Sequence, residues 1–191
     1  MAELAYAEVE MANYLYVDNS NVWIEGMHVA AVANGHAPSI WDALENKICD
    51  YSWKIDFGKL YEFAGGDKAE VGRAVLYGSR PPANDSLWSI AKAKGFEVVV
   101  YDRNVQNREK KVDTSIAADM IADSYERMDP AKDEITLVSG DRDLVPAVEK
   151  LRKRGFKVDV VFWDHASGEL KNAASQFVCL NPHLSLLALK K

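Results

Sequence analysis

Several features are scarce in this chain of 191 residues, and each scarcity removes a class of function. The two cysteines, Cys49 and Cys179, lack the spacing of metal ligands. No apolar run approaches the roughly 20 residues of a membrane-spanning helix. No G-x-G-x-x-G motif follows a strand pattern and no P-loop occurs, which argues against a nucleotide-binding or redox Rossmann domain. The net charge of -6 excludes tight nucleic-acid binding driven by overall positive charge, although a nuclease site is itself acidic.

The composition is that of an intracellular globular domain. The beginning of the chain carries Glu3, Glu8 and Glu10, which is the wrong chemistry for a secretory signal. Without such a signal, the cysteines are most simply free thiols in a reducing compartment. Hydrophobic residues make up 48% of the chain, enough for a substantial core, and the length fits one domain. We therefore expect a cytoplasmic protein with one domain over residues 1–191 and no membrane contact.

The apolar pattern predicts an α/β fold. Short segments rich in β-branched and aromatic residues recur at 14–17, 73–78, 96–101, 134–140, 157–163 and 176–180. Stretches with helical periodicity lie between them, at 84–94, 113–128 and 144–154. Strands that are apolar on both faces and alternate with helices indicate a parallel sheet covered by helices.

Residues 33–56 interrupt this alternation and are predicted to be an insertion between the first helix and a helix near 57–64. The segment contains Trp41 and Trp53, a proline and mixed charge. The two rings either pack the insertion onto the domain or stack on a nucleic-acid base.

Aspartates follow three of the predicted strands. Asp18 follows the first, Asp113 comes after a polar loop beyond 96–101, and Asp141 and Asp143 follow 134–140. Ligands of parallel sheets bind beyond the carboxyl ends of the strands, so these side chains converge if the strands are neighbours. Each aspartate taken alone has a simpler interpretation as a helix cap or a turn residue.

Converging carboxylates repel one another unless a cation neutralises them. Because the pattern offers oxygen ligands without histidine or cysteine, it favours Mg²⁺ or Mn²⁺. Such an ion activates water and stabilises charge at a phosphate, which is the chemistry of phosphodiester hydrolysis. Asp119 lies on a polar helical stripe and ranks below the other acids.

Four segments together resemble the NYN domain family, a branch of the PIN-like ribonucleases that includes the LabA-like and DUF88 proteins. They are YLYVDNSNVW, KKVDTSIAADM, LVSGDRDLVPAVEKLRKRGFKVDVVF and WDHASGELKNAASQFVCL. The resemblance runs from about 13 to 181, apart from the insertion. It implies a Rossmann-like three-layer α/β/α fold and metal-dependent cleavage of RNA.

The resemblance also assigns roles to residues. Asp18, Asp113, Asp141 and Asp143 match the acids of the family's motifs. Asn21 matches the asparagine of its D-x-x-N motif, where it would orient Asp18 or a water on the metal. Asp119 matches a position where the family often has an acid, which makes it a further candidate metal ligand.

Cations near the acids are candidates for contacting single-stranded RNA. Arg103, Arg108, Lys110 and Lys111 precede Asp113, and their alternative is a solvated loop. The basic run 150–155 ends a predicted helix, where cations suit the helix dipole, and is read as structural.

Other functions stay open at this point. The same fold could serve as a catalytically weak or inactive module that binds RNA or acts as a scaffold. A phosphatase of small esters would use the same metal chemistry. A phosphoacceptor receiver domain needs a lysine after a late strand, where this chain has Asp164 and His165. A homodimer is compatible with the fold, and no sequence feature decides it.

Overall fold

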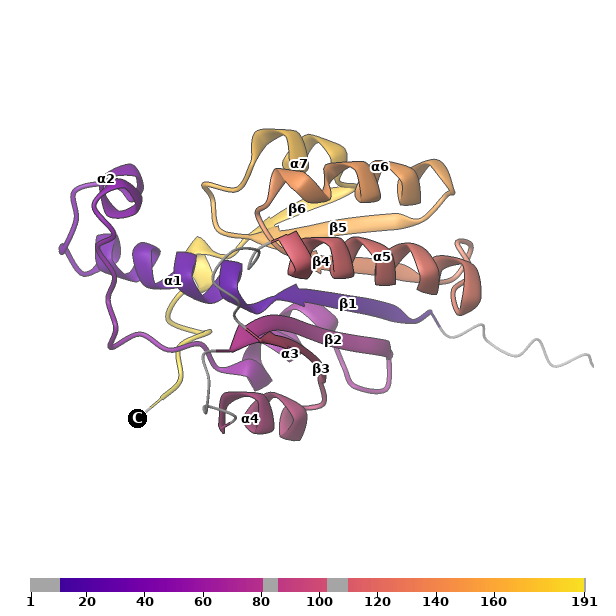
Figure 1. Cartoon of the computed structure of the whole chain (residues 1–191), viewed down its shortest axis with the longest axis horizontal. Coiled ribbons are helices and arrows are strands. Elements are labelled where there is room, and N and C mark those ends of the chain that lie inside the picture. The colour runs from indigo at the N-terminus through magenta and orange to yellow at the C-terminus, as the bar shows by residue number, and fades with distance from the viewer. Residues whose placement is uncertain (1–10, 81–85, 103–109, 191) are drawn as a thin grey trace, which may run out of the picture.

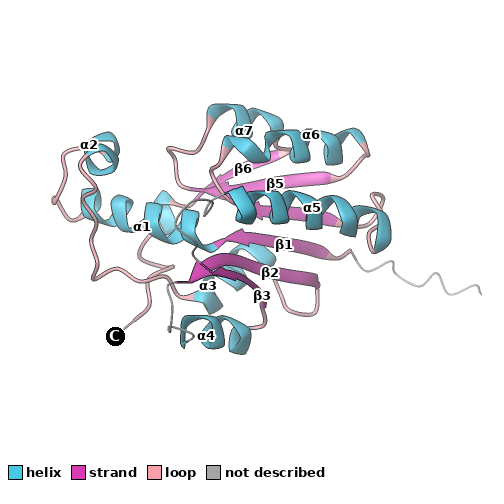
Figure 2. Ribbon diagram, in the orientation of Figure 1, coloured by secondary structure: helices cyan, strands magenta, loops and turns pink. Residues whose placement is uncertain are grey.

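The computed structural model describes residues 11–80, 86–102 and 110–190, and their centre is one six-stranded sheet (Figures 1 and 2). All its neighbouring strands are parallel, in the order β3-β2-β1-β4-β5-β6. The strands are β1 (Asn13–Asp18), β2 (Val71–Arg80), β3 (Glu97–Asp102), β4 (Glu134–Val138), β5 (Lys157–Phe162) and β6 (Gln176–Cys179). The predicted α/β class and the six predicted strand positions are confirmed.

Helices cover both faces of the sheet and complete three layers. One face carries α1 (Asn19–Ala33), α3 (Phe57–Gly65) and α4 (Ser86–Lys94). The other face carries α5 (Lys110–Glu126), α6 (Val145–Lys153) and α7 (Gly168–Ala173), which run beside one another in Figure 1. None of the helices within the described residues is long and apolar enough to cross a membrane.

The alternation of side chains along β1 produces the two cores. Leu15 and Val17 point to the α1 face, while Tyr14 and Tyr16 point to the α5 face, and all four are buried. Because both faces of the strand are covered, its central residues 14–17 are all apolar or aromatic. The same alternation places Asp18, the next residue, beyond Tyr16 on the α5 side.

The order of the strands creates a switch point between β1 and β4. From β1 the chain builds outward through β2 to β3, and from β4 it builds outward through β5 to β6. The helices that follow β1 and β4, α1 and α6, therefore cover opposite faces of the sheet, and parallel sheets bind their ligands at the carboxyl ends of strands at such a switch point. The fold thus positions Asp18 and the residues after β4 side by side.

The segment after α1 contains the short helix α2 (Ile40–Glu45), which projects beyond the end of the sheet (Figure 1). The two tryptophans of the segment at 33–56 differ in their exposure. Trp53 is buried, packs edge-on against Trp163 at 5.8 Å and donates its indole N–H to the Leu184 carbonyl. Trp41 is 66% exposed. Packing therefore accounts for Trp53 and leaves Trp41 without that explanation.

The end of the chain returns to this segment. Ala188 forms an antiparallel bridge with Ile55, and Leu187 is fully buried. The Leu187 carbonyl accepts a hydrogen bond from the Asp56 N–H at 2.8 Å. The sequence pattern did not predict this contact.

Candidate active site

Asp18 is the last residue of β1 and also the N-cap of α1. Its carboxylate accepts a hydrogen bond from the Asn21 N–H at 3.1 Å, and the residue is only 5% exposed. The capping role that the sequence left open is therefore present. It satisfies part of the carboxylate and does not neutralise its charge.

Asn21 joins the exits of β1 and β4. Its side-chain oxygen accepts hydrogen bonds from the Gly140 N–H at 2.8 Å and from the Ser139 hydroxyl at 3.2 Å. The hydrogen bond from Asn21 to Asp18 comes from the backbone N–H of Asn21 and not from its side-chain amide. The Asn21 side chain therefore holds the turn that carries Asp141, and its predicted role in orienting a water on the metal stays a prediction.

The turn after β4 is a tight structure built on Ser139 and Gly140. The Asp141 N–H donates to the Ser139 hydroxyl at 3.2 Å, and the Asp141 carboxylate accepts from the Asp143 N–H at 2.9 Å. Asp141 thus caps the short 3₁₀ helix Arg142–Leu144. Gly140 lies against the Phe162 ring, since a Cβ at this position would come within 2.3 Å of that ring. Asp143 is exposed on the same turn.

Helix α5 contributes the remaining acids. It begins at Lys110, earlier than predicted, so Asp113 lies inside its first turn and is not its N-cap. Asp119 accepts a hydrogen bond from the Tyr77 hydroxyl at 2.6 Å. Asp123, one turn further on, is neutralised by Arg73 at 2.5 Å and Arg127 at 3.1 Å.

The pKa of Asp18 reports the electrostatic interactions of the site. Burial, together with the negative charges of Asp113 and Asp141, raises the pKa of the Asp18 carboxyl from 3.8 to about 7, against the opposing effect of the hydrogen bond from Asn21. Asp113 and Asp141 are therefore each close enough to Asp18 for their charges to disfavour its ionised form.

This donor set fits a hard divalent cation in its chemistry and charge. Its ligands are oxygens, and a cation would offset the repulsion that raises the pKa of Asp18. Across residues 11–80, 86–102 and 110–190, no three acidic, histidine or cysteine side chains are already gathered as a metal site. Mg²⁺ commonly keeps several waters and uses one or two carboxylates, so it does not require such a cage.

The candidate RNA contacts are only partly described. Arg103, Arg108 and the side chain of Lys110 lie outside the described residues, while Lys111 is exposed near the start of α5. In the basic run at 150–155, Arg152 donates to the carbonyls of Ala173 and Ala174. Arg154 binds Ser124 and stacks on Tyr125 at 3.2 Å. These contacts support the structural reading of that run.

The sequence did not single out Tyr77, which lies near the site, and it did not indicate the partner of His165. Tyr77 holds Asp119, and its position beside Asp18 in the sheet is visible only from the strand register. His165, in the loop after β5, lies 2.8 Å from the Glu25 carboxylate on α1. Glu25 follows Asn21 by one helical turn, and that spacing was the available signal for a shared face.

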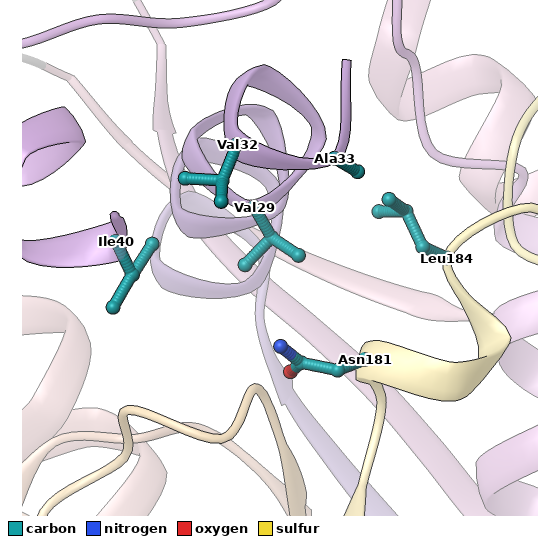
Figure 3. Close-up of a pocket in the computed structure, with 6 residues that line it drawn as sticks. All are labelled: Val29, Val32, Ala33, Ile40, Asn181 and Leu184. Atoms are coloured by element: carbon teal, nitrogen blue, oxygen red, sulfur yellow. The ribbon is translucent and has the colours of Figure 1, made fainter. Parts of the chain in front are cut away.

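A small pocket lies elsewhere, towards the far end of α1 (Figure 3). It has a volume of about 190 Å³ and is lined by Val29, Val32, Ala33, Ile40, Asn181 and Leu184. The lining has no titratable side chain, so the pocket has none of the groups of the acidic site.

Comparisons with known proteins agree with this architecture. The NYN domain family matches residues 21–181. Among curated proteins, none matches the chain. A crystal structure of a protein of unknown function from Vibrio parahaemolyticus is similar, with a TM-score of 0.67 and 22% identity, over 96% of this chain and 99% of that one. A dehalogenase structure has a TM-score of 0.42 and 14% identity, over 96% and 100% of the two chains, and carries no argument.

Proposed function

The chain belongs to the NYN domain family, which has a PIN-like nuclease fold, and from this membership we propose that it is a metal-dependent ribonuclease. The substrate is RNA in single-stranded form, and the cofactor is Mg²⁺ or Mn²⁺. The reaction is hydrolysis of a phosphodiester bond by water.

One observation carries the proposal beyond family membership. Asp18 is a buried carboxyl whose pKa is raised to about 7, and two further acids from different elements add to that rise. Repelling charges at the switch point of the sheet lower the stability of the fold. Such a cost is typical of functional sites. A divalent cation would convert this repulsion into binding energy.

The residues divide into ligands and supports. Asp18, Asp113 and Asp141 would hold the cation, and Asp143 would contact it directly or through water from the exposed turn. Asn21 supports the site by fixing the Gly140 turn against α1. A bound cation supplies Lewis acidity, which favours deprotonation of water and offsets charge on the phosphate. The exposed Lys111 would contact the RNA backbone, together with Arg103, Arg108 and Lys110.

Asp119 belongs in the outer part of the site. Its neighbour on the helix, Asp123, has two arginines, whereas Asp119 has an uncharged phenol and no ion pair among the described residues. Its charge therefore remains available to attract a cation at longer range or through water.

A second candidate is a non-catalytic RNA-binding or scaffold module with the same fold. The observation that favours it is that the described acids do not already form a group of three ligands. This module would bind RNA and leave it intact with any divalent metal.

The test is cleavage of end-labelled single-stranded RNA with Mn²⁺, with Mg²⁺ and with chelator. Asp141→Asn keeps the shape of the side chain and removes its charge. Asp164→Asn is the matched control, because Asp164 is an exposed acid that follows the neighbouring strand β5 and pairs with Lys171. We expect metal-dependent cleavage that Asp141→Asn abolishes and Asp164→Asn retains. RNA binding without cleavage by the wild type would support the second candidate.

A further inference from the structure

Two buried polar atoms next to the acidic site have no hydrogen-bond partner within the described part of the chain. They are the side-chain oxygen of Asn19 and the indole N–H of Trp23. Asn19 is the first residue of α1 and directly follows Asp18, and Trp23 lies one turn further along. Residues four apart lie on one face of a helix, about 5–6 Å apart at their Cβ atoms. An unpaired acceptor and an unpaired donor therefore face the same region beside Asp18.

One carboxylate oxygen of Asp159 and one ring nitrogen of His165 are also buried without a partner in the residues that the structure describes, but two other buried tryptophans and the next asparagine of α1 have partners. The indole N–H of Trp53 donates to the Leu184 carbonyl at 3.1 Å, and that of Trp163 donates to the Val22 carbonyl at 2.8 Å. The side-chain oxygen of Asn21, on the same helix, accepts two hydrogen bonds. Because a buried donor or acceptor without a partner is costly, the exception at Asn19 and Trp23 needs a reason.

Packing fixes where the Trp23 indole points. The Trp23 ring meets the Phe57 ring edge-on, at 6.2 Å and an interplanar angle of 87°. Asn19 is 5% exposed, and both unpaired atoms are shielded from water. The ligand group must be small, and it enters when the Asn19 amide rotates about its side-chain bonds.

The chemistry identifies that group. It must accept a hydrogen bond from the Trp23 N–H and donate one to the Asn19 oxygen, and a single hydroxyl does both. The ribose of RNA carries such a hydroxyl at its 2′ position, and DNA does not. A phosphate held at Asp18 brings its own ribose next to Asn19, the adjacent residue.

We propose that Asn19 and Trp23 bind the 2′-hydroxyl of the ribose beside the reacting phosphate and so select RNA over DNA. This inference rests on the proposed nuclease function. A site built to hydrogen-bond a hydroxyl rejects a ligand without it, because its own buried groups are then left unpaired.

The experiment compares RNA and DNA oligonucleotides of one sequence, with Trp23→Phe as the test variant. Trp53→Phe is the matched control, since it also loses a buried indole N–H, one that already has a protein partner. Two quantities are measured: kcat/KM for each oligonucleotide with Mn²⁺, and the Kd of each by fluorescence anisotropy with chelator. Asn19→Ala removes the acceptor and provides a second variant in case Trp23→Phe fails to fold.

The wild type should prefer RNA by about 10-fold or more in kcat/KM and in affinity. Trp23→Phe and Asn19→Ala should lose most of that preference through weaker action on RNA, with DNA unchanged, and Trp53→Phe should keep it. Equal kcat/KM and equal Kd values of the wild type for RNA and DNA would overturn the inference. So would an unchanged preference in both variants, which would mean that the pair holds only a buried water. If nothing is cleaved, the nuclease proposal fails by itself, and the ratio of the two Kd values still tests the pair.

Discussion

Replacing the Asp18 carboxyl by an amide removes the most costly charge of the candidate site. In the folded chain the pKa of this carboxyl is raised from 3.8 to about 7 by burial and by Asp113 and Asp141. A rise of that size destabilises the folded state by roughly 4 kcal/mol once the group is ionised. An asparagine at position 18 still accepts the Asn21 N–H, so the helix cap survives. Asp18→Asn should therefore make the metal-free protein more stable at pH 8.

The pH dependence has a definite sign. Between about pH 4 and pH 7 the folded Asp18 keeps a proton that the unfolded chain has released, so the folded state binds more protons. The penalty is absent below about pH 4, grows as the pH rises and is complete above about pH 7. The stability advantage of Asp18→Asn over the wild type should therefore be larger at pH 8 than at pH 5, by roughly 3 kcal/mol.

Urea unfolding in chelator at the two pH values measures this difference, because the other titrating groups are common to both proteins. Adding Mn²⁺ at pH 8 should stabilise the wild type and not the variant, which narrows the gap. The reasoning would be refuted if the advantage of Asp18→Asn were equal at pH 5 and pH 8. It would also be refuted if the variant were the less stable protein at pH 8.

Three further predictions address the parts around Asp18. Gly140→Ala should lower the free energy of unfolding by about 1–3 kcal/mol, because the new Cβ would come within 2.3 Å of the Phe162 ring; urea unfolding measures it, and an unchanged midpoint would contradict the tight turn. Asn21→Ala should cost about 1–3 kcal/mol and slow RNA cleavage, since it leaves the Gly140 N–H unpaired; wild-type rates would remove its supporting role. Charge reversal at Lys110 and Lys111 should weaken RNA binding and flatten its dependence on salt; unchanged affinity in a salt titration would exclude this contact.

The alternation of strands and helices could be predicted because the strands are short runs rich in β-branched and aromatic residues and because several of the helices have an apolar period. The positions of Asp18 and Asp141 at strand ends followed from the same pattern. Because β1 and β4 are parallel neighbours in the sheet, these two carboxylates lie at the same edge.

The contacts between loops could not be predicted in the same way. Asn21 was expected to orient Asp18 or a water on the metal, and nothing in the sequence indicated that its side-chain oxygen also holds Gly140, which is 119 residues away along the chain. The partner of Asp119 is Tyr77, on another strand. Periodicity describes a single segment, so pairings between distant segments appear only when the strand register is known.

The two tryptophans of the segment at 33–56 show the same limit. Both are large aromatic side chains of the kind that usually pack in a core, yet only Trp53 is buried. The difference comes from the end of the chain, which returns to cover Trp53 and bonds its indole N–H through Leu184. No local pattern near Trp41 or Trp53 indicates which of the two rings the residues around Leu184 cover.

The central claim is that water, activated at the acidic site, hydrolyses RNA. The most direct measurement is mass spectrometry of the products formed from single-stranded RNA with Mn²⁺ in water enriched in oxygen-18. Hydrolysis by water predicts one heavy oxygen in each newly formed terminal phosphate and no 2′,3′-cyclic phosphate. Cyclic phosphate ends without label, or intact RNA after incubation with folded protein, would contradict the account.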